Sequence, residues 1–194
     1  MRDATATRER IVRAAEEVVV TDGVACLTLE KAAARAGLSK GGVLYHFRSR
    51  ADLVAAMVER LAVQFDDGIR EHHAARRAAS ELAGGDGTGL FARAYVEECL
   101  AEPVTEAQRH QERVGSALIA AIASEPALLG PLREAFASWQ SQIVEDAADP
   151  GAVVRATVAR LAADGLWLCE LFGIDALTPQ LRDDVRTELL RMVS

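Results

Sequence analysis

The chain has 194 residues, half of them hydrophobic, so it is long enough to bury a substantial core. Only 5% of the residues are aromatic and alanine is abundant, a composition that favours helices. The formal net charge of −7 at first argues against a nucleic-acid partner. No apolar run approaches the ~18 residues that a membrane span needs, and the opening MRDATATRER lacks the apolar centre of a signal peptide. We therefore expect a cytoplasmic protein that has no contact with a membrane.

The cysteine and histidine pattern gives no sign of a metal or a disulfide. Cys26, Cys99 and Cys169 are odd in number and too far apart for either motif, which agrees with a reducing compartment. His72 and His73 are adjacent, so on a helix they point about 100° apart and do not share a face. We expect neither a metal site nor a cofactor.

The charge is unevenly distributed along the chain. Residues 1–50 carry nine basic and six acidic side chains, a net charge of +3. The remaining residues carry 13 basic and 23 acidic side chains, a net charge of −10. A basic segment on an acidic body indicates a local anionic partner, although chance alone would also produce such an asymmetry.

Hydrophobic periodicity and capping residues predict the helices in chain order. The first spans about residues 7–21, with apolar side chains every three or four positions before Gly23. Thr28, Ser39 and Ser49 are N-cap candidates for the next three helices, the last of them long. Further helices are predicted at about residues 90–101, 105–124, 126–147, 150–172 and 178–193. With no strand pattern and no repeat, the sequence predicts an all-α fold of about nine helices.

Residues 28–50 have the form of a helix-turn-helix motif. Two short capped helices are separated by a turn at Gly37, and the second helix reads SKGGVLYHF. In such motifs the second helix enters the major groove of DNA and presents its N-terminal residues to base edges. The apolar side chains predicted to pack inward are Ala33, Ala36, Leu38, Leu44 and Phe47.

The adjacent glycines Gly41 and Gly42 have a physical reason in this setting. Glycine in a helix interior costs roughly 1 kcal/mol, but it lets the backbone approach the floor of the groove closely. Lys40 suits a phosphate or a guanine edge, and Val43, if it faces the groove, suits a thymine methyl group. Hydroxyl and imidazole donors and the capped helix ends suit phosphates.

Residues 8–55 resemble the DNA-binding head of the TetR family of bacterial transcriptional regulators. The resemblance is carried by AARAGLSKGG, by LYHF, and by Arg50 followed by Asp52 and Leu53. It departs at Ala32, where the family usually has a larger aliphatic residue, which predicts looser packing there. Arg50 replaces the more usual lysine. The motif and the resemblance together predict DNA contacts from Thr28, Ser39, Lys40, Gly41, Gly42, Val43, Tyr45, His46 and Arg50.

The resemblance also implies that residues 1–50 form the DNA-binding domain and residues 51–194 a ligand-binding and dimerisation domain. The helix at about 150–173 carries large apolar residues around most of its circumference, so it needs cover on two sides. With the last helix, at about 178–193, it is predicted to form the interface of a homodimer; burial of both helices inside a monomer is the alternative. A two-fold dimer places two recognition helices about 34 Å apart, one turn of DNA.

Aromatic side chains of the second domain are candidates for lining an effector cavity. Such a lining suits an apolar or amphipathic small molecule, and core packing is the alternative interpretation. Glu97, Glu98 and His110 lie on otherwise apolar segments, where a buried carboxylate would favour a cationic ligand and a solvated face is the alternative. The candidate lining residues are Phe91, Tyr95, Phe136, Trp139 and Trp167.

The sequence thus predicts a ligand-responsive transcriptional regulator, most simply a repressor. It would bind a palindromic operator in double-stranded DNA as a homodimer and be released by a small-molecule effector. No nucleophile elbow or comparable catalytic arrangement is visible, so we expect no enzyme. The alternative is a helical enzyme or small-molecule carrier with an accidental helix-turn-helix match, and salt-dependent DNA binding distinguishes the two.

Overall fold

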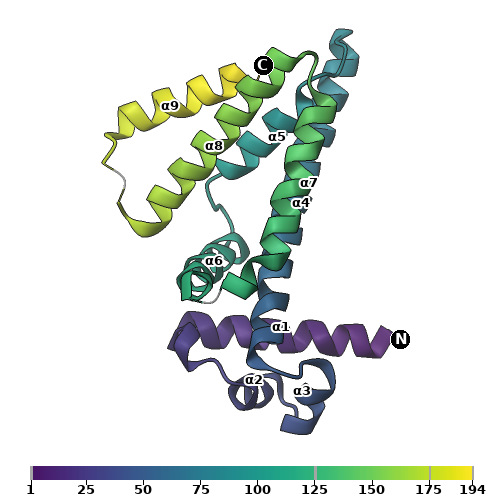
Figure 1. Ribbon diagram of the computed structural model, residues 1–194, viewed down its shortest axis with the longest axis vertical. Helices are drawn as coiled ribbons and strands as arrows, with labels where there is room; N and C mark the ends of the chain where they lie inside the picture. The colour runs from purple at the N-terminus through teal and green to yellow at the C-terminus, as the bar shows by residue number, and fades with distance from the viewer. Residues whose placement is uncertain (1, 125, 175, 194) are drawn as a thin grey trace. The chain divides into compact units, whose positions relative to one another are not determined.

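A computed structural model of the chain describes residues 2–124, 126–174 and 176–193, except for the side chains of residues 2, 3 and 120–127. All regular structure in these ranges is helical, which confirms the predicted fold class (Figure 1). None of the described helices is long and apolar enough to cross a membrane. The helices are α1 Arg2–Asp22, η1 Val24–Cys26, α2 Leu29–Ala36, α3 Lys40–His46, α4 Arg50–Ala83, α5 Leu90–Cys99, α6 Glu106–Ser124, η2 Pro126–Leu129, α7 Gly130–Asp146, α8 Pro150–Phe172 and α9 Pro179–Met192.

Capping side chains start the last two helices where the sequence predicts. At the start of α8, Asp149 accepts a hydrogen bond from the backbone N–H of Ala152 at 2.9 Å. At the start of α9, Thr178 accepts one from Leu181 at 3.3 Å. Gly173 ends α8 with a φ of 62°, in the left-handed region that glycine adopts without strain. Local chemistry therefore determines these boundaries.

Two helices differ from their predicted bounds. α1 begins at Arg2 rather than near residue 7, because the polar segment before its apolar stripe contains no helix breaker. The segment predicted as one helix at 126–147 starts as the 3₁₀ helix η2 and continues as α7.

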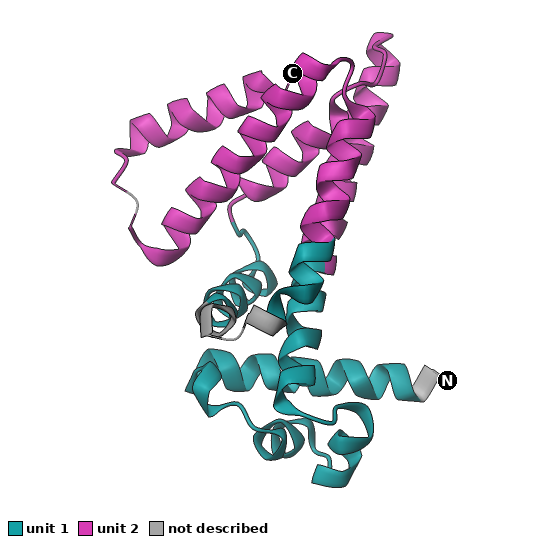
Figure 2. Ribbon diagram, viewed as in Figure 1, with its two compact units in different colours: residues 1–62, 103–134 teal, residues 63–102, 135–194 magenta. Residues whose placement is uncertain are grey.

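The helices form two compact units (Figure 2). The first contains residues 1–62 and 103–134, and the second contains residues 63–102 and 135–194. The first unit is larger than the predicted domain of residues 1–50, because it includes the start of α4 together with α6 and η2. Helix α4 contributes residues to both units.

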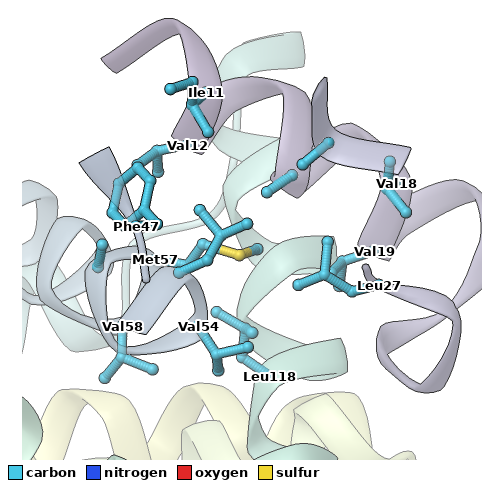
Figure 3. Close-up of a cluster of buried hydrophobic side chains, with 14 of the residues drawn as sticks. Ile11, Val12, Val18, Val19, Leu27, Phe47, Val54, Met57, Val58 and Leu118 are labelled. Atoms are coloured by element: carbon cyan, nitrogen blue, oxygen red, sulfur yellow. The ribbon is translucent and has the colours of Figure 1, made fainter. Parts of the chain in front are cut away.

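The core of the first unit joins the helix-turn-helix to α1, α4 and α6 (Figure 3). Helix α6, far away in sequence, packs against α1 and supplies Val114 and Leu118. Ala32, where we expected looser packing, is completely buried. The buried side chains include Ile11, Val12, Val18, Val19, Leu27, Phe47, Val54, Met57 and Val58. The helix-turn-helix is therefore stabilised by α6 as well as by its own short helices.

The inward face of α3 differs from the prediction at two positions. Val43 and Phe47 are four residues apart, so they lie on one side of the helix, and both are buried in the core. Leu44 follows Val43 directly, points away from that side and is 39% exposed, so its predicted place in the core is wrong. The side chain of Val43 is completely buried, so it does not face outward as its suggested contact with a thymine methyl group requires.

A charged pair lies among these apolar side chains. Glu16 of α1 is buried, and its Oε1 lies 3.1 Å from Nε of Arg60 on α4. The contact is electrostatic, because the Nε–H group is not aligned for a hydrogen bond. The Arg60 guanidinium also pairs with Glu9. Burial raises the pKa of Glu16, and the positive charge of Arg60 opposes that shift.

Candidate nucleic-acid interface and effector site

Side-chain caps position the two helices of the helix-turn-helix. Thr28 Oγ1 accepts a hydrogen bond from the backbone N–H of Lys31 at 3.1 Å, where α2 begins. Ser39 Oγ accepts one from Gly42 at 3.1 Å, where α3 begins. Gly37 lies between them with a φ of 66° and ends α2. Thr28 and Ser39 therefore have a structural role at these helix starts, and their contact with DNA stays a prediction.

The start of α4 is a reciprocal capping box formed by Asp52 with Ser49, the predicted N-cap. The Asp52 N–H donates to Ser49 Oγ at 3.0 Å, and the Ser49 N–H donates to Asp52 Oδ2 at 3.1 Å. Arg50 donates from Nε to the carbonyl of Leu27 at 3.1 Å and from Nη2 to that of Val24 at 3.0 Å. Arg50 thus connects α4 to the segment before α2, a role that sequence reasoning missed.

The start of α3 is open. A Cβ added to Gly41 would meet only Ser39 Oγ, at 3.9 Å, and one added to Gly42 would lie 3.4 Å from the same oxygen and 3.9 Å from Leu38 Cβ. Tyr45 is 83% exposed, and its ring contacts that of His46 edge-on with a centroid separation of 5.1 Å. Because Gly41 is exposed and Gly42 is partly exposed, this end of α3 can approach another surface with its backbone.

Three basic side chains of the helix-turn-helix have acidic partners. Lys40 Nζ lies 2.6 Å from Glu30 Oε1, which connects the starts of α3 and α2. Lys31 pairs with Asp22 at 2.8 Å. The remaining pair joins Arg35 to Glu17 of α1 at 3.2 Å. The bond from Lys40 lowers the pKa of Glu30, so this carboxylate is ionised at neutral pH.

The second unit contains a cluster of aromatic rings. Phe65 of α4 makes edge-on contacts with Tyr95 of α5 and with Trp139 of α7, at centroid separations of 5.3 and 5.1 Å. Tyr95 and Trp139 also meet, at 5.7 Å, and Phe136 lies 5.2 Å from Trp139. The structure thus brings together three of the five predicted lining residues. Phe65 also belongs to this cluster but was not among the predicted lining residues, because it lies in the apolar stripe of the long helix α4.

The other two predicted lining residues lie outside this aromatic cluster. Phe91 is buried and lies 6.2 Å from the ring of His73. Trp167 is half-buried on α8 and makes no ring contact with another described residue.

Partly buried polar groups orient the aromatic cluster. The Tyr95 hydroxyl donates to Asp164 Oδ1 at 2.8 Å, and Arg160 Nη1 lies 2.9 Å from the other oxygen of that carboxylate. Burial raises the pKa of Asp164, against the bonds from Tyr95 and Arg160. Trp139 Nε1 donates to Asp66 at 3.1 Å. Two ring residues are therefore tethered by carboxylates from other helices.

The three polar residues singled out on apolar segments have different surroundings. Arg76 and Arg93 both pair with Glu97. Glu98 packs against Gly68, where a Cβ would lie 2.3 Å from its carboxyl carbon, and burial raises its pKa. His110 belongs to α6 and hence to the first unit. Within the described part of the chain, no three His, Cys, Asp or Glu side chains are grouped as metal ligands.

Helix α8 has two dissimilar faces. Its buried side consists mainly of alanines, and the helix packs against α5 and α9. Its large aliphatic side chains are turned outward, and Leu161 is 56% exposed. Other exposed apolar residues of α8 and α9 are Val154, Val158, Leu168, Phe172 and Leu181. The chain itself therefore leaves an apolar face on these two helices uncovered.

The chain belongs to the tetR family of bacterial regulatory proteins. The family model for these proteins matches residues 11–57, which include the helix-turn-helix. A second family model, the tetracyclin repressor-like C-terminal domain, matches residues 89–194, more than half of the chain. The first match covers the helix-turn-helix, and the second covers helices α5 to α9, which contribute to both compact units.

Individual relatives agree with this assignment. The HTH-type transcriptional regulator TtgR of Pseudomonas putida is 37% identical over 79 residues, 41% of this chain and 35% of its own length. The chain thus matches about a third of the length of that curated relative. A transcriptional regulator from Rhodococcus sp. Rha1 has a similar fold, with a TM-score of 0.67 and 22% identity over 96% of this chain and 93% of its own. The multidrug binding protein EbrR, solved with ethidium, gives a TM-score of 0.64 and 27% identity over 96% and 97%.

Proposed function

We propose that the protein is a transcriptional regulator that binds double-stranded DNA through α3. One observation carries this proposal: the start of α3 presents bare backbone at Gly41 and Gly42, while Val43 and Phe47 anchor its other side in the core. A short helix held in this way can enter the major groove without bulky side chains keeping it away from the base edges. Family membership supports the same role.

The DNA contacts in this proposal are those of the open face of α3. Lys40 reaches a phosphate or a guanine edge, and the glycines bring the backbone close to the groove floor. Tyr45 and His46, at the other end of the helix, donate to phosphates. The remaining candidates, Thr28, Ser39 and Arg50, act mainly by holding the motif in shape, because each already bonds to backbone groups of its own chain.

The regulator acts as a homodimer through α8 and α9 in this proposal. Large aliphatic side chains such as Leu161 are exposed on a face that the chain does not cover, and contiguous apolar surface of this kind favours association. A two-fold interface contacts itself with the same patch on both subunits. It would present two α3 helices to successive turns of a palindromic operator.

The effector site lies in the second unit, beside the aromatic cluster, in this proposal. The cluster offers ring faces and edges to an apolar or amphipathic small molecule, and EbrR, with 26% and 27% identity, has been solved with malachite green and with ethidium. An effector that binds the DNA-free state more tightly shifts the population away from DNA, and such coupling is typically ~1–3 kcal/mol. The protein would then act as a repressor.

Salt-dependent binding to a short mixed-sequence duplex tests the DNA-binding role. The affinity of the protein for this duplex is measured by fluorescence anisotropy. The logarithm of the binding constant should fall linearly with the logarithm of the salt concentration, because phosphate contacts release counterions. Replacing Lys40 by alanine should weaken binding about five- to tenfold and reduce the salt slope by about one. Undetectable binding at low ionic strength would contradict the proposal, and an unchanged affinity of the Lys40→Ala variant would contradict the assigned contact.

The dimer interface has its own test. Replacing Leu161 by glutamate should convert the dimer to a monomer in sedimentation velocity, because it places a charge in each half of a buried apolar patch. Leu82→Glu is the matched control, since Leu82 is 91% exposed near the end of α4 and lies outside α8 and α9. A dimer that survives Leu161→Glu, or one that Leu82→Glu abolishes equally, would place the interface elsewhere.

A further inference from the structure

The amino group predicted to contact DNA is already bound to a carboxylate within the same motif. Lys40 Nζ and Glu30 Oε1 are 2.6 Å apart, and both side chains are more than half exposed, at 59% and 58%. Solvent and DNA can therefore reach the pair. Glu30 lies in the first turn of α2, where a negative charge is favourable next to the free N–H groups of the helix.

We propose that Glu30 competes with DNA phosphate for Lys40 and thereby limits the DNA affinity of the protein. A phosphate oxygen and the Glu30 carboxylate offer the same kind of bond to an ammonium group, so Lys40 must give up one to make the other. Once Lys40 moves to DNA, Glu30 is left as an unpaired negative charge close to the phosphates. This inference rests on the proposed function and adds Glu30 as a residue that sets the DNA affinity.

Two other ion pairs of α2 have a structural role instead. Lys31 and Arg35 pair with Asp22 and Glu17 of α1, so their bonds hold α2 to α1. The pair of Lys40 with Glu30 instead connects the two helices of the motif at their N-terminal ends, and it engages the predicted contact residue of α3 itself. Neutralising Glu30 should therefore alter DNA binding while it leaves the packing of α1 on α2 intact.

The test is a double-mutant cycle on a short mixed-sequence duplex at low salt, read by fluorescence anisotropy. Replacing Glu30 by glutamine should tighten binding about two- to fivefold, as expected for release of an exposed ion pair. The same replacement in a Lys40→Ala background should have a clearly smaller effect, because the group for which Glu30 competes is gone and only repulsion between Glu30 and the phosphates is relieved. Thermal unfolding of each variant checks that the fold is unchanged.

Glu59→Gln is the matched control for the loss of one negative charge. Glu59 has the same 58% side-chain exposure and pairs with Arg8 at 3.3 Å in the same unit, but it lies on α4. An equal gain from Glu59→Gln, or an undiminished gain in the Lys40→Ala background, would overturn the inference in favour of a general charge effect. Unchanged binding by Glu30→Gln while the wild type binds would also overturn it. If neither the wild type nor Glu30→Gln binds any duplex, the proposed function itself is overturned.

Discussion

Replacing Arg60 by methionine is expected to lower the free energy of unfolding by about 3 kcal/mol at pH 7, the largest stability effect that we predict. The variant leaves Glu16 buried against apolar neighbours with its main counter-charge removed. The value lies at the lower end of the range for broken buried pairs, because the Arg60 side chain is 20% exposed. Urea unfolding followed by circular dichroism measures it.

The loss should depend on pH in a defined direction. Burial already raises the pKa of Glu16 above its ordinary value near 4.5, and removing Arg60 raises it further. The folded variant then holds the Glu16 proton more tightly than the unfolded chain does. Its stability therefore falls as the pH rises from the ordinary glutamate pKa through the raised pKa of Glu16 in the folded variant. The difference between the variant and the wild type should therefore shrink as the pH falls towards 4.5.

A second substitution provides the control for this pair. The double variant Arg60→Met with Glu16→Gln removes the buried charge and should recover a substantial part of the lost stability. If the double variant is as unstable as Arg60→Met, or if the loss does not shrink as the pH is lowered from about 7 towards the ordinary pKa of a glutamate, the pair does not act as described.

Replacing Gly41 by leucine is expected to weaken DNA binding about a hundredfold while the protein stays folded, the largest functional effect that we predict. A Cβ at this position meets only Ser39 Oγ at 3.9 Å, and leucine favours helix more than glycine does, so the melting temperature should stay the same or rise. The added side chain would hold α3 away from the groove floor and break two or three contacts of roughly 1–3 kcal/mol each.

The matched control for this variant is a glycine in the same unit but outside the motif. Gly130 has no atom within 4 Å of an added Cβ, and Gly130→Leu should leave DNA affinity unchanged. Gly41→Ala, with a smaller side chain, should have an intermediate effect. A folded Gly41→Leu variant that binds DNA as tightly as the wild type would show that α3 does not approach the groove with its backbone.

The starts of α4, α8 and α9 and the end of α8 were predictable because short-range chemistry sets them. Asp149 and Thr178 cap α8 and α9 with bonds to N–H groups three residues further along, and Gly173 ends α8 in the left-handed region. The reciprocal bonds of Ser49 and Asp52 are equally local. Each signal occupies a few consecutive residues and can be recognised without knowledge of the fold.

Interactions between distant residues were not predictable in the same way. The Arg60–Glu16 pair and the bonds from Arg50 to the carbonyls before α2 depend on how the helices cross. The sequence shows that α3 is amphipathic, but a rotation of one position decides that Val43 is buried and Leu44 is not. A helix of seven residues has too few turns for its apolar pattern to show whether Val43 or Leu44 faces the core.

The aromatic cluster illustrates the same limit in the second unit. Tyr95 and Trp139 were predicted as lining residues because they are aromatic, whereas Phe65 occupies a regular position in the apolar stripe of a long helix. Asp164, which accepts the bond from Tyr95, lies 69 residues further along the chain. Only packing shows that these groups form one cluster.

Selection of bound sequences from a random pool of DNA duplexes tests the central claim most directly. If two copies of the protein present α3 to successive turns of the major groove, the pool should converge on a two-fold symmetric consensus with half-site centres about 34 Å apart. The Gly41→Leu variant should enrich no sequence under the same conditions. Failure of the wild type to enrich any sequence, or a consensus without two-fold symmetry, would contradict the account.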